Sequence, residues 1–387
     1  MHVKGFLHKL LASVMHKKRL ITLTILVMTV LKNKRLSLTE LGRAMELPIK
    51  ERSGIRRADR FLGNKKLHQE REIIHEEVIK RVIGGHTRPD MIVDWSSIPN
   101  TTHHTLRAAM VAEGRALTLY EQVHSEKKLG NKKIQNKFLQ KLKTLLPDGC
   151  KPIIITDAGF HNDWFKEVLR MGWDYIGRIR GKKYLKIAKQ EWQLCSNLFK
   201  KRAATPEYLG KAELCKSNPL EINLCIFKGK RKGRKGLNKS GKKRSDSTSL
   251  DYRKAAKEPW LLATSLPESY FLAKRVVKKF SFRMQIEEGF RDLKSSRYGF
   301  GFENAYSERR ERIEVLLLIA MLASFIAWLT GWIAEKKGLH YQFQSNTIKN
   351  RRVLSLFFLG CQLIRRKIKI PVSTIMTAID KELCHAA

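Results

Sequence analysis

The stretch 280–294, FSFRMQIEEGFRDLK, decides the fold: its strong helix formers, without proline, predict one helix of about four turns. Four apolar residues recur every three or four positions and predict one buried face: Phe282, Ile286, Phe290 and Leu293. A second stripe, one residue further on, carries the charges: Arg283, Glu287, Arg291 and Lys294. Because a helix turns by about 100° per residue, this stripe lies at the edge of the buried face. Taken alone, the pattern is equally typical of a surface helix with salt bridges.

The composition indicates a polyanionic partner. The 387 residues include 77 Lys+Arg against 36 Asp+Glu, a formal net charge of +41. An excess of this size repels itself, so nucleic acid is the first candidate partner and an acidic membrane surface the second. The 43% hydrophobic content predicts that most of the chain folds, and the length of 387 residues predicts two or three domains. The six cysteines form no C-x-x-C pair, which argues against a zinc knuckle or disulfide framework and favours a reducing cytosol.

One apolar stretch, 315–334, has the length of a membrane span, with arginines before it and lysines after it. It includes Ser324, Thr330 and two tryptophans, and a helix buried on all sides in a large domain has the same composition. We therefore predict a core helix and no membrane partner. No secretory signal is expected, because the apolar run 21–31 lies deep in the chain without a small-residue cleavage site after it.

Residues 1–80 are predicted to form a helical, basic DNA-binding domain. Ser37 and Glu40 form a capping box that opens a short helix, and Pro48 closes the following turn. The next helix carries three arginines that are candidate DNA contacts: Arg56, Arg57 and Arg60. Two short helices with a turn are compatible with a helix-turn-helix contact to DNA, and a generic basic bundle is the equal alternative.

Residues 88–300 have the pattern of an α/β catalytic domain. Apolar runs predict five strands, at 91–98, 106–112, 116–123, 152–156 and 175–180. Helices are expected at 132–146 and 162–171, with Asn162 as the cap of the second. The order βββαβαβ, followed by the helix 280–294, is that of ribonuclease-H-like folds, in which the first and fourth strands lie side by side.

Two aspartates are expected to meet at these central strands. Asp94 lies on the first strand and Asp157 ends the fourth. A lone aspartate in a buried strand is costly unless it is paired or bound to a metal. Two of them, with no cation nearby in sequence, favour a divalent metal over the alternative of a structural ion pair. An all-oxygen site suits Mg²⁺ or Mn²⁺ rather than zinc.

Residues 181–275 are predicted to be a β-rich insertion, with strands at 220–227 and 260–264. Between these strands, 228–244 carries ten Lys/Arg in seventeen residues, four glycines and no acid. This composition predicts a mobile basic loop that follows phosphates, and a merely solubilising loop is the alternative. The region 305–387 is expected to be helical and basic, and it is the candidate region for dimerisation.

Several segments together resemble bacterial cut-and-paste DDE transposases of the insertion-sequence-four family, close to enzymes of the transposon-ten type. The similar segments are LTELGRAM, ADRFLGN, IVDWSSI, ITDAGF, EPWLLATSLP, RMQIEEGFRDLKS and QSNTIKNRRVLS. The family's late signature is a tyrosine, an arginine, a glutamate and a lysine at fixed spacing. Arg283, Glu287 and Lys294 match it in register, whereas Phe280 stands at the tyrosine position.

The resemblance implies that Asp94, Asp157 and Glu287 bind two Mg²⁺ ions per active site, with Mn²⁺ as a substitute. The implied activity is cleavage at transposon ends by nicking, hairpin formation and resolution, followed by strand transfer into target DNA. The implied partners are double-stranded DNA, at the terminal inverted repeats and at the target, and a second copy of the chain in a paired-end complex. The implied location is the cytoplasm, on the nucleoid.

The resemblance also implies DNA contacts around this site. Arg283 and Lys294 would position end phosphates, and Arg291 on the same stripe is a further candidate. Trp260 matches a tryptophan that stacks on a flipped base, with core packing as the alternative. Phe280 lacks the hydroxyl that the family places near the end phosphates. Two rival functions stay open: a catalytically impaired, transposase-derived DNA-binding protein, and a structure-specific nuclease of the same fold.

Overall fold

The computed structural model describes residues 3–200, 204–229 and 258–368, which form a mixed α/β protein with two compact units. Unit 1 contains the described residues up to Cys150 and those from Met284 onward, and unit 2 extends from Lys151 to Arg283. From residue 230 on, the predicted basic loop 228–244 lies outside the described residues. The end of the predicted region 305–387, from residue 369 on, lies outside them too. The predicted domain borders stay predictions.

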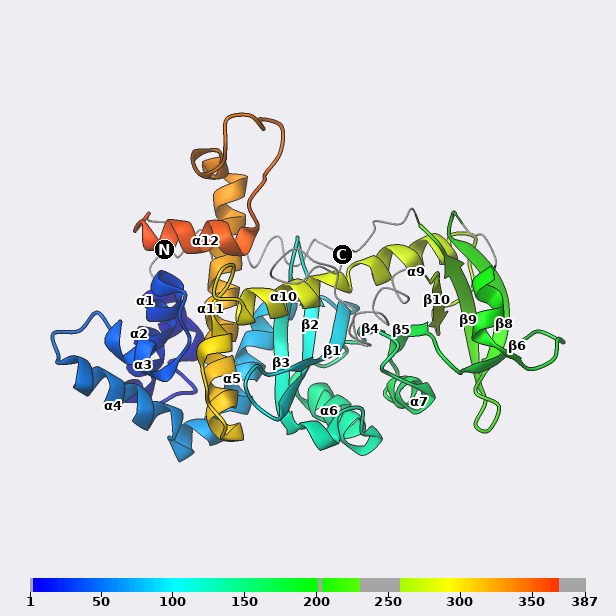
Figure 1. The fold of residues 1–387 in the computed structure, drawn as a ribbon, viewed down its shortest axis with the longest axis horizontal. Helices are drawn as coiled ribbons and strands as arrows, with labels where there is room; N and C mark the ends of the chain where they lie inside the picture. The colour runs from blue at the N-terminus through cyan, green and yellow to red at the C-terminus, as the bar shows by residue number, and fades with distance from the viewer. Residues whose placement is uncertain (1–2, 201–203, 230–257, 369–387) are drawn as a thin grey trace, which may run out of the picture. The chain divides into compact units, whose positions relative to one another are not determined.

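Unit 1 begins with helices, as expected for residues 1–80 (Figure 1). They are α1 (Val3–Leu11), α2 (Lys17–Asn33), α3 (Leu38–Arg43), α4 (Glu51–Leu62) and α5 (Lys65–Ile83). The Ser37 side chain caps α3 by accepting a hydrogen bond from the Glu40 backbone N–H. A Cβ on Gly54 would lie only 2.2 Å from the carbonyl oxygen of Gly42, so glycine permits the close approach of α3 and α4. The two short helices therefore form a tight pair.

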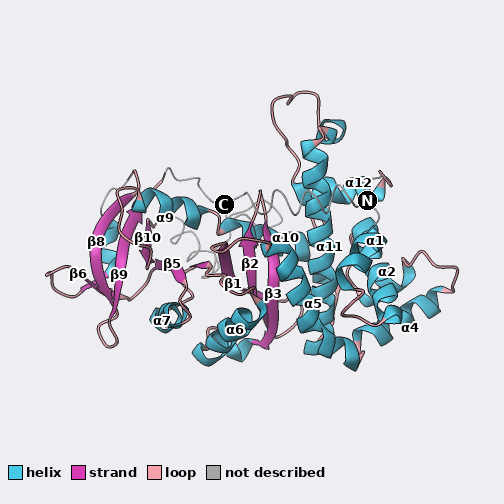
Figure 2. Ribbon diagram, turned by 180° about the vertical axis from the view of Figure 1, so that it is seen from behind, coloured by secondary structure: helices cyan, strands magenta, loops and turns pink. Residues whose placement is uncertain are grey.

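The sheet of unit 1 contains β1 (Asp90–Ser97), β2 (His103–Val111) and β3 (Ala116–Ser125). The strands are antiparallel in the order β3-β2-β1, and η1 (Glu126–Lys128) and α6 (Lys132–Leu145) follow. On one face, the Tyr120 ring lies 5.3 Å from the rings of both His75 of α5 and Phe138 of α6. Helices α5 and α6 therefore cover this face, beside which they appear in Figure 2.

The C-terminal part of unit 1 is built around one long helix, α11 (Arg310–Lys336). It is preceded by α10 (Met284–Lys294) and η3 (Phe302–Asn304), and followed by η4 (Leu339–Phe343) and α12 (Leu356–Arg365). Helix α11 is long and apolar enough to cross a membrane, but 94% of its most apolar window is buried inside the protein. A Cβ on Gly331 would lie 1.9 Å from the Leu356 carbonyl oxygen, so α12 crosses α11 closely. The predicted core helix agrees with this burial.

Unit 2 consists of a mostly antiparallel sheet with two helices. Its described strands are β4 (Ile153–Thr156), β5 (Asp174–Ile179), β6 (Tyr184–Ile187), β7 (Gln193–Leu194), β8 (Glu207–Leu214), β9 (Leu220–Phe227) and β10 (Trp260–Thr264). They follow the order β4-β5-β10-β9-β8-β6-β7, in which only the β4–β5 pair is parallel. The helical elements are α7 (Asn162–Arg170), η2 (Cys195–Lys200) and α9 (Leu272–Ser281).

The predicted single helix over 280–294 is wrong: α9 ends at Ser281 and α10 begins at Met284. Phe282 N–H donates to Lys279 O at 3.1 Å and Arg283 N–H to Phe280 O at 3.0 Å, which tightens the chain into a turn. Before this turn Phe280 is buried in unit 2, and after it Ile286 and Phe290 are buried in unit 1. The residues of one apolar stripe in the sequence are therefore buried in the cores of two different units.

Two smaller differences concern unit 2. Asn162 is the first residue of α7, whose N-cap is His161. The strands β6, β7 and β8 were not predicted, because β6 and β7 are only four and two residues long and β8 begins with half-buried rather than alternating positions.

Candidate active site and nucleic-acid contacts

Asp94 lies on the sheet face of unit 1 opposite to the one that α5 and α6 cover. In the strand register, Asp94 stands across from Arg107 of β2, which stands across from Glu121 of β3. Asp94 is half-buried, and its Oδ1 accepts the Trp95 backbone N–H at 2.8 Å. The three charges thus form one row across the sheet, with the negative Asp94 at the β1 end.

Arg107 is held by the sheet itself. Its Nε and Nη2 donate to Glu121 Oε2 at 3.0 and 2.8 Å, and both side chains are buried. The Arg107 guanidinium also lies 4.5 Å from the centre of the Phe290 ring on α10. Because a buried charge pair with good geometry is costly to break, Arg107 and Glu121 form a rigid support beneath α10.

Lys294 ties the end of α10 to the strand that carries Asp94. Its Nζ donates to Ser96 Oγ at 2.7 Å and lies 5.4 Å from the centre of the Phe290 ring. Burial lowers the pKa of Lys294 to about 8; the positive charge of Arg107 adds to this, and Asp94 opposes it. This predicted DNA contact is therefore a cation held in place by unit 1.

Glu287 lies on the side of α10 that meets β1. It is half-buried and precedes Lys294 by about two helical turns, which places both side chains on one side of the helix. Since Lys294 bonds to Ser96, and Ser96 and Asp94 share one face of β1, Asp94 and Glu287 belong to facing elements. The structure thus brings two of the three predicted acids to one region of unit 1.

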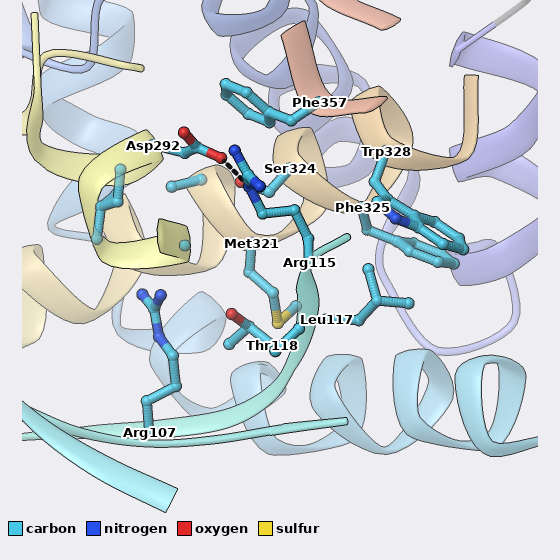
Figure 3. Close-up of a pocket in the computed structure, with 14 residues that line it drawn as sticks. Arg107, Arg115, Leu117, Thr118, Asp292, Met321, Ser324, Phe325, Trp328 and Phe357 are labelled. Carbon is cyan, nitrogen blue, oxygen red and sulfur yellow. Dashed lines mark hydrogen bonds and ion pairs between the residues drawn. The ribbon is translucent and has the colours of Figure 1, made fainter. Parts of the chain in front are cut away.

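A further residue of unit 1, Arg115, holds α10 through two other acids of the helix and was missed by the sequence analysis. Its Nη1 pairs with Glu288 Oε2 at 2.5 Å and its Nε with Asp292 Oδ2 at 2.7 Å. Figure 3 shows the Arg115–Asp292 pair at a cavity of about 40 Å³ that Met321 of α11 also lines. Burial raises the pKa of Asp292, and the charge of Arg115 opposes this shift. No spacing rule connects a hairpin arginine to a helix so far along the chain, so the sequence carried no signal for it.

Asp157 lies in unit 2, directly after β4. Its Oδ1 accepts the Gly159 backbone N–H at 2.7 Å, which fixes the carboxylate in the turn. Burial lowers the pKa of Arg178 on β5, whereas Glu258 and Asp157 raise it, so Asp157 lies near a cation of its own unit. Glu258 pairs with Arg180 at 2.5 Å.

Trp260 and Phe280 contact each other within unit 2. Their ring centres lie 5.0 Å apart with the planes at 73°, and the centre of the Phe227 ring lies 5.9 Å from that of Trp260. Phe280 is 2% exposed, whereas Trp260, the first residue of β10, is half-buried. Both predicted DNA contacts are therefore members of an aromatic cluster, and Arg283 follows it, half-buried, in the turn after α9.

The other predicted DNA contacts lie on other surfaces of unit 1. Arg291 of α10 is exposed, with its guanidinium 5.7 Å from the Tyr298 ring centre. Arg56 and Arg60 are exposed on α4. Arg57 differs, because its Nη2 and Nε donate to Thr22 Oγ1 of α2 at 3.0 and 3.3 Å, so it helps to hold α4 in place.

The three predicted acids have the donor chemistry of a divalent-metal site. Within residues 3–200, 204–229 and 258–368, no group of three or more His, Cys, Asp or Glu side chains could hold a metal ion. Asp94 and Glu287 nevertheless offer only carboxylate oxygens on facing elements, and Asp157 would add another of the same kind. Oxygen ligands of this type fit Mg²⁺ or Mn²⁺.

Three predicted acids in an α/β protein with a formal net charge of +41 indicate a protein that acts on a polyanion such as nucleic acid. The family model described as Transposase DDE domain matches residues 85–326, which include Asp94, Asp157 and Glu287. The chain belongs to this family and is a transposase, for which DNA is the implied partner and divalent metals are the usual cofactors. No curated protein matches the chain significantly.

Proposed function

We propose that this chain is a cut-and-paste transposase of the insertion-sequence-four family, close to the transposon-ten enzymes. It nicks DNA at transposon ends, forms and resolves hairpins there, and joins the freed ends to target DNA. The observation that carries the proposal is the pairing of β1 and α10 within unit 1. These elements bear Asp94 and Glu287, and Lys294 ties them together through Ser96.

The proposed active site consists of Asp94, Asp157 and Glu287 in a ribonuclease-H-like fold, with the first and fourth strands adjacent. Two Mg²⁺ ions bound there, or Mn²⁺ in their place, would activate the attacking oxygen and stabilise the leaving one in an in-line displacement. Arg283 and Lys294 hold end phosphates on either side of Glu287 along the chain. Arg107 stays with Glu121 and keeps the sheet beneath α10 rigid.

The proposed partners are double-stranded DNA and a second copy of the chain. Arg56 and Arg60 of α4 contact the terminal inverted repeats, Arg291 adds a phosphate contact, and Trp260 stacks on a flipped base. Two copies hold two ends in a paired-end complex, for which the region 305–387 is the proposed dimerisation surface. The proposed location is the cytoplasm, on the nucleoid.

The test is to replace each acid by its amide: Asp94→Asn, Asp157→Asn and Glu287→Gln. Each change removes one ligand charge but keeps the side-chain shape, so each should abolish strand cleavage in Mg²⁺ and leave end binding intact. The substrate is a labelled duplex that carries the inverted repeats flanking the gene. The matched control is Glu126→Gln, which changes an exposed acid of unit 1 in the same way, and this variant should cleave normally. Near wild-type cleavage by any of the three amide variants would show that the ligand assignment is wrong.

One observation favours a second candidate, a catalytically impaired DNA-binding relative. Phe280 has no hydroxyl to offer, and its ring is buried against Trp260. The same time course decides between the candidates, because an impaired protein binds ends without forming nicked, hairpin or joined products. Products that are cleaved but never joined would instead identify a structure-specific nuclease of the same fold.

A further inference from the structure

The outer face of α9 in unit 2 is strongly basic. The inner face of this helix is buried against β8, β9 and β10, and its buried residues are Leu272, Ala273, Val276, Val277 and Phe280. The outer face exposes Lys274, Arg275 and Lys278. Among the described residues, no acid forms an ion pair with any of these three cations. The helix contains no Asp or Glu, so the face has an uncompensated positive charge.

Two exposed aromatic residues precede this face. Tyr270 is 93% exposed and Phe271 60%, and their rings pack edge to face with centres 4.8 Å apart. The Lys274 Nζ lies 5.8 Å from the centre of the Phe271 ring, so the aromatic pair and the basic face are continuous. Adjacent large aromatic side chains with this exposure are unusual on a protein surface and indicate a binding surface.

We propose that the α9 surface, defined as Tyr270, Phe271, Lys274, Arg275 and Lys278, binds a DNA strand. The three cations contact phosphates, and the two rings stack on bases or deoxyribose beside them. This combination of stacking rings and cations is the one that nucleic-acid-binding grooves use. The inference rests on the proposed action on DNA and adds a contact that is separate from the three acids, Trp260 and Arg283.

The burial of α9 favours DNA over an anionic membrane. A helix that binds a lipid surface must insert its apolar face. The apolar face of α9 is already buried against the sheet of unit 2, which leaves only the cations and the two rings for a partner. The formal charge of +41 on the whole chain favours a polyanion over an acidic peptide segment.

The experiment measures the affinity of the full chain for DNA in EDTA, so that no strand is cut. The probes are a duplex and a single strand of the same sequence, about three helical turns long and without any inverted repeat. The cation variant Lys274→Ser/Arg275→Ser/Lys278→Ser should weaken binding about tenfold or more at 0.1 M salt. The slope of log affinity against log salt should become shallower by about 2–3 units. The control Lys133→Ser/Lys137→Ser removes two exposed lysines of α6. It should not reproduce the loss of affinity and of salt slope seen for the cation variant.

The aromatic variant Tyr270→Ser/Phe271→Ser removes only surface groups and should keep the salt slope. It should lose about five- to a hundredfold in affinity, and the larger loss on the single strand would identify unpaired bases as the stacking partner. An equal loss on both probes would identify contacts to a duplex. An unchanged salt slope for the cation variant would overturn the proposal. So would a loss seen only with vesicles of anionic phospholipid.

The inference and the proposed function fail in different ways. If the acid variants cleave normally while the α9 variants lose DNA affinity, the catalytic assignment falls and the α9 surface stands. If the α9 variants bind DNA like the wild type while Asp94→Asn abolishes cleavage, the reverse holds.

Discussion

Lys294 Nζ donates to Ser96 Oγ at 2.7 Å, and this bond joins the end of α10 to the strand that bears Asp94. Ser96 is two residues after Asp94, so both side chains lie on one face of β1. The bond therefore sets the position of α10 along the strand, and with it the position of Glu287 two turns earlier. It also keeps a cation beside Asp94 in the free protein.

The first prediction concerns pH. Burial lowers the pKa of Lys294 from its ordinary value to about 8, so the amine loses its proton as the pH rises through that value. A DNA phosphate needs the protonated form, so the affinity for transposon-end DNA in EDTA should fall about tenfold between pH 7 and pH 9. Lys294→Arg keeps its charge over this range and should bind with nearly constant affinity. Parallel pH profiles for the two proteins would show that another group titrates.

The second prediction concerns Arg115. Arg115→Met leaves the buried carboxylate of Asp292 without its cation, so the free energy of unfolding should fall by about 3–5 kcal/mol. Glu288 is more exposed, so its pair with Arg115 should contribute little. Urea unfolding measures the loss, and the double variant Arg115→Met/Asp292→Asn should recover part of it, because no buried charge is then left unpaired. Additive losses in the double variant would argue against the pair.

The sequence predicted those parts of the fold and site that depend on local patterns. The strand of Asp94, the turn after Asp157 and the helix of Glu287 follow from apolar runs, caps and helical spacing. The turn at Phe282 and Arg283 was missed, because the apolar stripe runs through it without interruption. Periodicity records which positions are buried, but it does not record that Phe280 and Phe290 are buried in different units.

Contacts between residues that are far apart in the chain could not be predicted from local sequence patterns. Arg115 bonds to Glu288 of α10, which lies more than 170 residues further along the chain. Arg57 bonds to Thr22, although in the sequence it stands in the same arginine cluster as Arg56 and Arg60. The exposure of Tyr270 and Phe271 could not be inferred either, because two adjacent aromatics before a helix normally predict burial.

The third prediction separates the arginines of α4. Arg56→Gln/Arg60→Gln removes two exposed charges, so it should weaken binding to transposon ends and make the salt slope shallower by about 2 units. Stability should not change. Arg57→Gln should do the opposite and lower the free energy of unfolding by about 1 kcal/mol, because it loses the bonds to Thr22. Thermal unfolding and DNA titration of both variants would reveal whether these two roles are reversed.

The last prediction concerns Phe280, whose ring packs edge to face on Trp260 and is 2% exposed. Phe280→Tyr adds a hydroxyl to an apolar cluster, so the free energy of unfolding without DNA should fall by about 1–3 kcal/mol. With DNA at saturation, the same hydroxyl can bond an end phosphate once the end is distorted. Hairpin formation or strand joining should then be about ten- to a hundredfold faster, with end affinity nearly unchanged.

The measurement for Phe280→Tyr is a time course of nicked, hairpin and joined products at saturating DNA. Phe280→Leu is the matched control, because it disturbs the contact with Trp260 and adds no hydroxyl, so it should lower stability without raising any rate. Identical product curves for the wild type and Phe280→Tyr would mean that the end phosphates are positioned without this residue. Arg283 and Lys294 would then carry that task, because they match the remaining basic positions of the family signature.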